Sequence, residues 1–240
     1  MRSTSDKSTV ALIPISLDSK LFRTSVMAPA LVAIGGNFSN FLFLIADSLQ
    51  IYNKLWSTQH YVLGNAFENF ERLRKSYLAE RVKWIDRLCK NMKGAHPRQW
   101  MVRSSYEFMD AAFWRVYQRI LILYCMSKEM RKDVERVAID HTRKQKLLKA
   151  SAGSIRLSEA YLLEELALSV RVRVFEKIGS EFYLGQYPKP LLHLYDSRYG
   201  IDVGALAGRK TGGLEFYFFS WCQDDGKQEW TQANRPFGSE

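Results

Sequence analysis

Apolar residues in this chain fall into two patterns, short continuous runs and longer stretches with a helical repeat. Short β-branched or apolar runs bounded by Pro, Ser or Gly predict strands at residues 10–15, 29–34 and 99–103. Apolar positions spaced by three and four predict helices at residues 67–92 and 157–178. The two patterns alternate along the chain, and we therefore expect strands and helices to alternate as well.

The segments between these elements complete the alternation. We expect further helices from Ser104 or Ser105 to about 128, from there to 149, and at 39–55, and further strands at 60–63, 181–187, 192–195 and 214–222. Such an order is typical of a mostly parallel sheet with helices on both faces, a three-layer, Rossmann-like α/β fold. Residues 1–240 are expected to form a single domain with flexible polar tails at 1–8 and 224–240.

Composition narrows the class of protein. The chain is 47% apolar and 13% aromatic, which excludes a disordered protein or a small disulfide-stapled one. Its three cysteines are far apart, its four histidines are dispersed, and neither set has the spacing of a metal site. The first ten residues are polar and carry no export signal, and the apolar stretch at 38–51 is too interrupted to span a bilayer. We expect a cytoplasmic protein that does not bind a membrane.

Positive charge is concentrated in two helical segments. Lys and Arg outnumber Asp and Glu by 35 to 25, and residues 71–98 and 128–149 account for the whole excess. In the first segment, Lys83, Arg87 and Lys90 recur on one helix face, and Lys93 follows. A solvated helix face explains such a stripe equally well. The concentration of charge in two segments favours a surface that contacts a phosphate backbone.

The first candidate site lies after the apolar run at 29–34. In open α/β sheets, ligands bind where a strand ends and the next helix begins. If that run is a strand, its exit carries small, hydroxyl and amide residues, namely Gly35, Gly36, Asn37, Phe38, Ser39 and Asn40. The simpler interpretation is that Asn37 or Ser39 caps the following helix.

Two further candidates carry phenols and a carboxylate. Tyr161 and Glu165 are four residues apart, so they share one face of the predicted helix beside its apolar stripe. Tyr187 ends a predicted strand, and Pro188 restricts the turn that follows. An exposed Tyr–Glu pair without a function would show the same spacing.

These segments, in this order, resemble the cyclodipeptide synthases, a family that joins two aminoacyl groups from aminoacyl-tRNAs into a diketopiperazine. The family has a strand-exit motif of roughly Gly-x-Ser-x-x-Asn-x-x-Phe, a Tyr-x-x-x-Glu helix, a later Tyr that one subfamily follows with Pro, and a basic helix before an Arg-Ser strand end. The corresponding residues are Gly35, Asn40 and Phe43; Tyr161 and Glu165; Tyr187 and Pro188; and residues 67–92 before Arg103 and Ser104. The resemblance covers about residues 9–195.

One position departs from the family pattern. Asn37 stands where the first motif has its nucleophilic serine, and an amide cannot form an acyl ester. Three alternatives remain: Ser39 takes the nucleophile position, which we favour, the enzyme transfers directly, or activity has been lost. Asn40 suits one subfamily and Pro188 the other, which indicates a divergent branch similar to the fungal arginine-containing synthases.

The resemblance implies a catalytic domain similar to that of class I aminoacyl-tRNA synthetases and a set of roles. Ser39 would carry the aminoacyl group, Tyr161 and Glu165 would hold the α-amino group, and Tyr187 would assist ring closure. Gly35, Gly36, Asn37 and Asn40 would line the pocket, and Lys83, Arg87, Lys90 and Lys93 would contact tRNA phosphates. A tRNA ester is already activated, so the resemblance implies no ATP, metal or other cofactor, and no DNA partner.

Two other functions fit the same sequence. A non-catalytic tRNA- or RNA-binding protein of this fold would keep the basic helices and leave charged tRNA unconsumed. An adaptor for membranes or acidic proteins would bind anionic vesicles as well as tRNA, but the sequence has no lipidation signal. The oligomeric state is open, with a monomer favoured.

Overall fold

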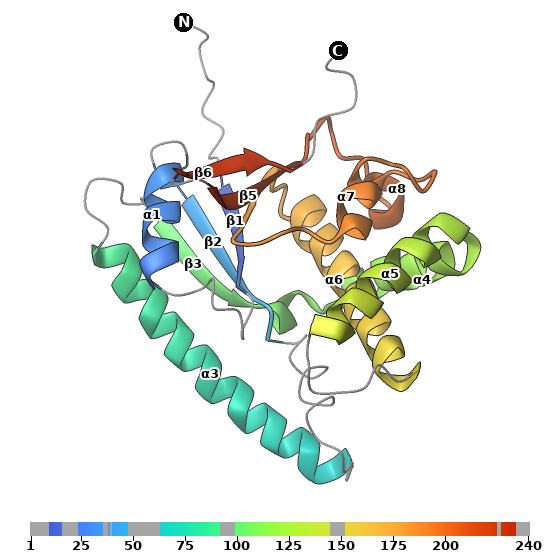
Figure 1. The fold of residues 1–240 in the computed structure, drawn as a ribbon, viewed down its shortest axis with the longest axis horizontal. Helices are drawn as coiled ribbons and strands as arrows, with labels where there is room; N and C mark the ends of the chain where they lie inside the picture. Colours follow the sequence, from blue (N-terminus) through green and yellow to red (C-terminus); the bar gives the residue numbers. More distant parts are fainter. Residues whose placement is uncertain are drawn as a thin grey trace, which may run out of the picture.

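The computed structural model describes residues 10–15, 24–35, 38, 40–47, 63–91, 99–144, 152–224 and 227–233. These residues form three layers, a central sheet with helices packed on each face (Figure 1). The predicted three-layer α/β fold is confirmed. No helix in the described part of the chain has the length and apolar character that crossing a bilayer requires.

The central sheet has six strands in the order β3-β2-β1-β4-β5-β6. The strands are β1 (Val10–Ile15), β2 (Asn40–Ile45), β3 (Gln99–Ser104), β4 (Ser180–Tyr183), β5 (Tyr217–Asp224) and β6 (Lys227–Gln232). Strands β1 to β5 are parallel, and β6 pairs antiparallel with β5 at one edge. The chain extends the sheet in one direction from β1 to β3 and in the other from β4, so the strand order reverses between β1 and β4.

The helices divide between the two faces of the sheet. They are α1 (Thr24–Gly35), α3 (Leu63–Asn91), the 3-10 helix η2 (Ser105–Phe108), α4 (Ala111–Met126), α5 (Lys128–Lys144), α6 (Ala152–Phe175), α7 (Lys189–Tyr195) and α8 (Val203–Ala207). Helices α1 and α3 form one core with the sheet, and α4 to α8 form the other. Figure 1 shows α3 as a long helix along the outer edge of the first layer.

The segment before β2 is a helix, and the strand predicted at residues 29–34 is wrong. Met27, Ala30, Leu31 and Ile34 are buried, with the spacing of one helix face turned to the sheet. Pro29 lies inside this helix and does not prevent it. Residues 29–34 taken alone are all apolar and so resemble a buried strand. The helical spacing is visible only over the whole segment, which begins at Thr24.

The helix predicted at residues 39–55 is also wrong where the structure describes it. Residues 40–45 form β2, whose positions 41–45 are all buried, because a central parallel strand is covered on both faces. Such a strand has no alternation of polar and apolar residues, so its period does not distinguish it from a buried helix. Residues 48–62 lie outside the described residues, and with them all but the last residue of the strand predicted at 60–63; that residue, Leu63, begins α3.

Two corrections concern the C-terminal third. Residues 192–195, predicted as a strand, belong to α7, which begins after Pro188. Residues 227–232, predicted to lie in a flexible tail, form β6, where the Trp230 indole donates a hydrogen bond to the backbone oxygen of Ala30 at 2.9 Å. The other predicted elements in the described residues are present with small shifts in their ends: β1, β3, α3, α4, α5, α6, β4 and β5.

Candidate active site

The strand-order reversal places the candidate site beside β1 and β4. In open parallel sheets this is where a crevice forms, beyond the carboxyl ends of the strands. Strand β4 ends at Tyr183. Tyr161 and Glu165 on α6 lie close enough to Tyr183 to interact with it electrostatically. The predicted pairing of Tyr161 and Glu165 on one helix face is therefore observed, and the pair faces the end of β4.

Glu165 is held in an environment that favours its protonated form. Burial raises the pKa of Glu165 to about 7, and the nearby negative charge of Glu181 adds to this effect. At neutral pH the carboxyl group therefore exists in both protonation states. A group of this kind both accepts and returns a proton near pH 7, which is the requirement for general acid–base chemistry.

Three phenols lie near Glu165 or its neighbour Glu181: Tyr161 and Tyr183 interact with Glu165, and Tyr187 interacts with Glu181. Burial raises the pKa values of Tyr161, Tyr183 and Tyr187, and the charge of Glu165 or Glu181 adds to the effect in each case. All three phenols are therefore neutral hydroxyl groups at physiological pH, able to donate one hydrogen bond each. The imidazole ring of His141 on α5 lies 6.0 Å from the Tyr161 ring, centroid to centroid.

Tyr187 lies four residues beyond β4 and is buried. Its hydroxyl donates a hydrogen bond to the backbone oxygen of Glu181 at 3.2 Å, and its ring packs edge-on against Phe218. Pro188 follows with φ −65° and ψ 133° and starts α7. The predicted position of Tyr187 near a strand end, with Pro188 restricting the next turn, agrees with this geometry.

Asn40, where the segment at residues 35–40 ends, lies at the amino ends of the strands and not at the carboxyl end of β4. Gly35 is the last residue of α1, and Asn40 is the first residue of β2, paired with Val10 at the amino ends of the strands. The expectation that this loop leaves the carboxyl end of a strand is wrong, because the segment before it is helical. Gly36, Asn37 and Ser39 lie outside the described residues. The fold thus removes the strand-exit argument for this segment, and the role of Ser39 stays a prediction.

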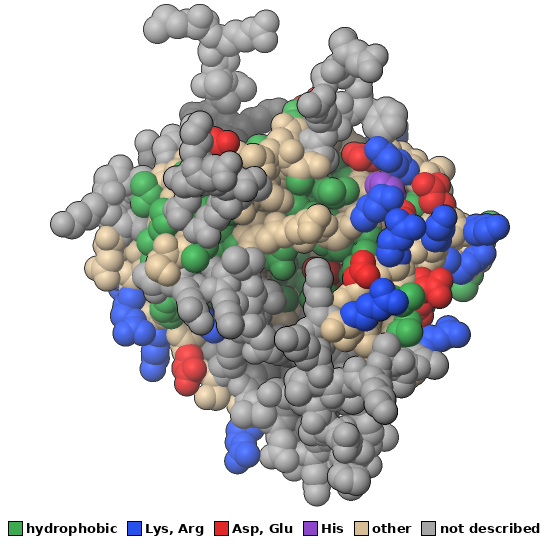
Figure 2. All heavy atoms as spheres, viewed as in Figure 1, with side chains coloured by type: hydrophobic (Ala, Val, Ile, Leu, Met, Phe, Trp, Pro, Cys, Tyr) green, Lys and Arg blue, Asp and Glu red, His purple; other side chains and the backbone are tan. Residues whose placement is uncertain are grey.

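The basic stripe lies on α3. Lys83, Arg87 and Lys90 are exposed, whereas Ile85 and Leu88 between them are buried against the sheet. Lys93 lies outside the described residues. Figure 2 shows Lys and Arg side chains at the lower left, where α3 runs in Figure 1, and a larger group at the right, over α4, α5, α7 and α8, in which Asp and Glu are interspersed.

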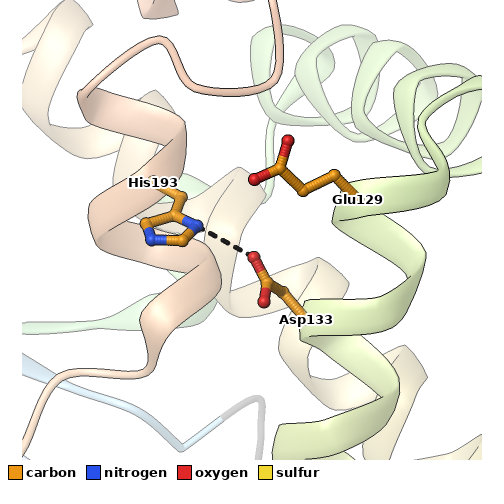
Figure 3. Close-up of side chains that lie close together, drawn as sticks. All are labelled: Glu129, Asp133 and His193. Atoms are coloured by element: carbon orange, nitrogen blue, oxygen red, sulfur yellow. Dashed lines mark hydrogen bonds and ion pairs between the residues drawn. The ribbon is translucent and has the colours of Figure 1, made fainter.

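A second cluster of ionisable groups joins α5 to α7 (Figure 3). Atoms of Glu129, Asp133 and His193 that are able to ligate a metal lie within 4.8 Å of one another. Asp133 already accepts hydrogen bonds from His193 at 2.8 Å and Tyr199 at 3.1 Å, and the Lys189 ammonium lies 3.6 Å from its other oxygen. The cation beside Asp133 opposes a divalent ion, and we interpret the cluster as a link between the two helices. The spacing of the histidines in the sequence did not indicate it.

Three residues of the candidate site were missed in the sequence. Glu181 and Tyr183 lie on the face of β4 opposite Phe182, toward α6, where Arg173 is fully buried. A charged residue within an apolar run was the available signal, since Arg173 stands between Val172 and Val174.

Comparisons with solved structures agree on one fold. A cyclodipeptide synthase (CDPS) from Fluoribacter dumoffii superposes with a TM-score of 0.68, 16% identity and 88% coverage of both chains. A cyclodipeptide synthase from Candidatus Glomeribacter gigasporarum, bound to Phe-tRNAPhe, gives a TM-score of 0.63, 15% identity, and coverage of 99% of this chain and 95% of that one. The chain has the fold of the cyclodipeptide synthases.

The cyclodipeptide-synthase fold also accounts for the expected likeness to synthetases. Rv2275 of Mycobacterium tuberculosis, whose structure demonstrates that cyclodipeptide synthetases are related to type I tRNA synthetases, matches with a TM-score of 0.56, 17% identity and 78% coverage of both chains. No protein-family model and no curated protein sequence matches the chain. Shared geometry, and not sequence identity, therefore carries the resemblance.

Proposed function

We propose that this protein is a tRNA-dependent cyclodipeptide synthase that joins two aminoacyl groups into a 2,5-diketopiperazine. The observation that supports this most is the group formed by Tyr161, Glu165 and Tyr187 near the end of β4, in a chain with the cyclodipeptide-synthase fold. Tyr187 is distant in sequence from Tyr161 and Glu165, and the fold brings it to the same end of β4.

The nucleophile that this fold favours is Ser16 and not Ser39. Strand β1 borders the point where strand order reverses, and it ends at Ile15, directly before Ser16 in the sequence. Ser16 itself lies outside the described residues. In this register the family motif matches at its Ser and Phe positions, Ser16 and Phe22, and departs at the other two, where Pro14 replaces Gly and Ser19 replaces Asn.

The chemistry follows from these groups. The Ser16 oxygen attacks the carbonyl carbon of the first aminoacyl ester, the bond to the tRNA 3′ oxygen breaks, and an aminoacyl-enzyme forms. Its α-amine attacks the second ester after Glu165 removes a proton, and the second tRNA leaves. The free amine of the resulting dipeptidyl-enzyme then attacks the seryl ester and releases the cyclic product. Tyr161 orients the amine, and Tyr187 positions the reacting carbonyl.

Helix α3 supplies the tRNA contact in this proposal. Exposed Lys83, Arg87 and Lys90 recognise phosphates by charge, which suits an enzyme that accepts more than one tRNA. The tRNA ester supplies the activation, so the reaction runs without ATP, metal or another cofactor. We place the enzyme in the cytoplasm, as a monomer, and expect an arginine-containing product from its resemblance to the fungal branch.

The deciding experiment is to incubate the protein with a pool of charged tRNAs and to search for diketopiperazine masses. The expected result is a cyclic dipeptide whose formation stops in Glu165→Gln, while the variant still binds tRNA. The mass also identifies the two amino acids, and a product without arginine would correct that part of the proposal. If charged tRNA is bound and remains unconsumed, the protein is a non-catalytic tRNA-binding protein of the same fold.

A further inference from the structure

Among the described residues, Arg173 is the bulkiest side chain that the fold buries completely. It lies on α6 two turns beyond Glu165, with 0% of its surface exposed. Its guanidinium donates hydrogen bonds to the backbone oxygens of Ile178 at 3.3 Å, Gly179, and Tyr217 at 3.0 Å. Arg173 thereby ties the end of α6 to the amino ends of β4 and β5.

The rest of the guanidinium is enclosed by aromatic rings and one carboxylate. Its central carbon lies 4.1 Å from the Phe218 ring centroid and 5.0 Å from that of Tyr195. Its Nη1 atom has no hydrogen-bond partner among the described residues, and Glu181 Oε2 lies 3.5 Å away as its ion-pair partner. An apolar residue would fill this space at lower cost in desolvation, so the buried charge calls for another reason.

Glu181 connects this arginine to the candidate site. It is 4% exposed, and its backbone oxygen accepts the hydrogen bond from Tyr187. Its negative charge acts on Glu165 and on the Tyr183 phenol, both partners in the site. One residue of β4 therefore contacts the buried cation, fixes a phenol and influences the carboxyl group that is proposed to move the proton.

We propose that Arg173 and Glu181 form a positioning ion pair, which keeps a fixed negative charge beside Glu165 and holds the Tyr187 loop against β4. This inference rests on the proposed function for the roles of Glu165 and Tyr187. Neither member of the pair touches substrate. The charge of Arg173 favours the ionised form of Glu181, and ionised Glu181 makes Glu165 a stronger base.

The other groups around Glu165 are neutral at physiological pH. Tyr161 on α6 and Tyr183 on β4 interact with it, Tyr187 interacts with the neighbouring Glu181, and burial raises the pKa of each phenol. Burial also raises the pKa of Glu181, and the charge of Arg173 opposes that increase. Loss of either member of the pair therefore removes the same negative charge, and Glu165 loses base strength in both cases.

The first test is a carboxyl titration of Glu165 by carbon NMR, with its signal assigned by its loss in Glu165→Gln. In Glu181→Gln, which keeps the volume of the side chain, the Glu165 midpoint should fall by about one pH unit from its wild-type value. This measurement needs neither tRNA nor turnover, so it tests the ion pair even if the wild type makes no cyclic product. An unchanged midpoint would overturn the inference.

The second test is the pH profile of kcat/KM for product formation. In Glu181→Gln the acid limb of this profile should move to lower pH by about the same shift. A purely structural defect would instead lower the rate equally at all pH values. Arg173→Met should give the same shift, and the double variant should shift no further than Glu181→Gln alone. Additive shifts would show two independent effects and refute the pairing.

Arg171→Met is the matched control. Arg171 lies on the same helix and pairs with Asp110 and Glu176. This variant should leave both the Glu165 midpoint and the acid limb unchanged, and a shift equal to that of Arg173→Met would count against a specific pair. If Arg173→Met does not fold, Glu181→Gln alone decides the question.

Discussion

Tyr187, four residues after the end of β4, donates a hydrogen bond from its hydroxyl to the backbone oxygen of Glu181 within that strand. Tyr187→Phe keeps the ring contact with Phe218 and removes this bond. We expect the free energy of unfolding to fall by about 1 kcal/mol, and cyclic product to form more slowly while tRNA binding stays unchanged. Denaturant unfolding and product mass spectrometry measure the two effects. Full activity in the variant would contradict the positioning role of Tyr187.

The raised pKa of Glu165 makes stability depend on pH. The ordinary pKa of the carboxyl group is 4.5, and in the folded protein it is about 7, so protonation favours folding. The contribution is complete below pH 4.5 and is lost as pH rises through 7, a loss of about 3 kcal/mol.

Comparison of the wild type with Glu165→Gln measures this loss. Denaturant unfolding at pH 5 and pH 8 should show a larger fall in the wild type than in the variant, which has no carboxyl group to titrate there. Equal falls would show that Glu165 is solvated like a surface carboxylate.

The two candidate nucleophiles are separable by trapping. With tRNA carrying a labelled amino acid, wild-type protein should retain label through an ester that mild base cleaves. Ser16→Ala should lose this label, and Ser39→Ala should keep it, because the loop at 35–40 joins the amino end of β2. The reverse result would return the nucleophile role to Ser39. Label in neither the wild type nor either variant would indicate direct transfer.

Charge reversal tests the role of α3 in tRNA binding. Replacing Lys83, Arg87 and Lys90 by Glu should weaken binding and reduce its salt dependence, by roughly 0.7–0.9 in log–log slope per lost phosphate contact. The matched control reverses three exposed cations of α5, namely Lys128, Lys132 and Arg136. The control should retain most of the affinity, and an equal loss in both triples would indicate nonspecific attraction.

The Asp133–His193 link should contribute to stability without a metal. Burial raises the pKa of Asp133, but hydrogen bonds from Tyr199 and His193 and the charge of Lys189 outweigh it, so the pKa is lower than usual. This stability is present above the ordinary carboxyl pKa and is lost as pH falls through the folded value. Asp133→Asn should cost about 2 kcal/mol at pH 7, by denaturant unfolding. A rise in wild-type Tm with added Zn²⁺, absent in His193→Ala, would identify a metal site instead.

Much of the architecture follows from local sequence patterns. The apolar run of β1 is short and bounded by polar residues, the repeat of α3 has a helical period, and both elements are present as predicted. At α1 and β2 the patterns are ambiguous, because a strand buried on both faces and a buried helix are both continuously apolar. The sequence pattern predicted a strand where α1 lies and a helix where β2 lies. The expected strand exit was therefore placed at residues 35–40 instead of at the end of β1.

The candidate site was predictable only in part, for a similar reason. Tyr161 and Glu165 are close in sequence, and helical spacing alone pairs them. Arg171 and Arg173 look equivalent in the sequence, but a helix turns about 200° over two residues, so one meets surface carboxylates and the other enters the core. Their difference depends on where β4 and β5 lie, which the local pattern does not specify.

The central position of β1 has a consequence for folding while the protein is being synthesised on the ribosome. Strand β1 is made first, yet one of its two neighbours is β4, and Ala11 pairs with Ser180. Until that residue leaves the exit tunnel, a nascent chain containing β1, β2 and β3 presents an open strand edge to other chains. Prematurely terminated chains should therefore aggregate, and full-length yield should depend on chaperones that shield this edge during synthesis.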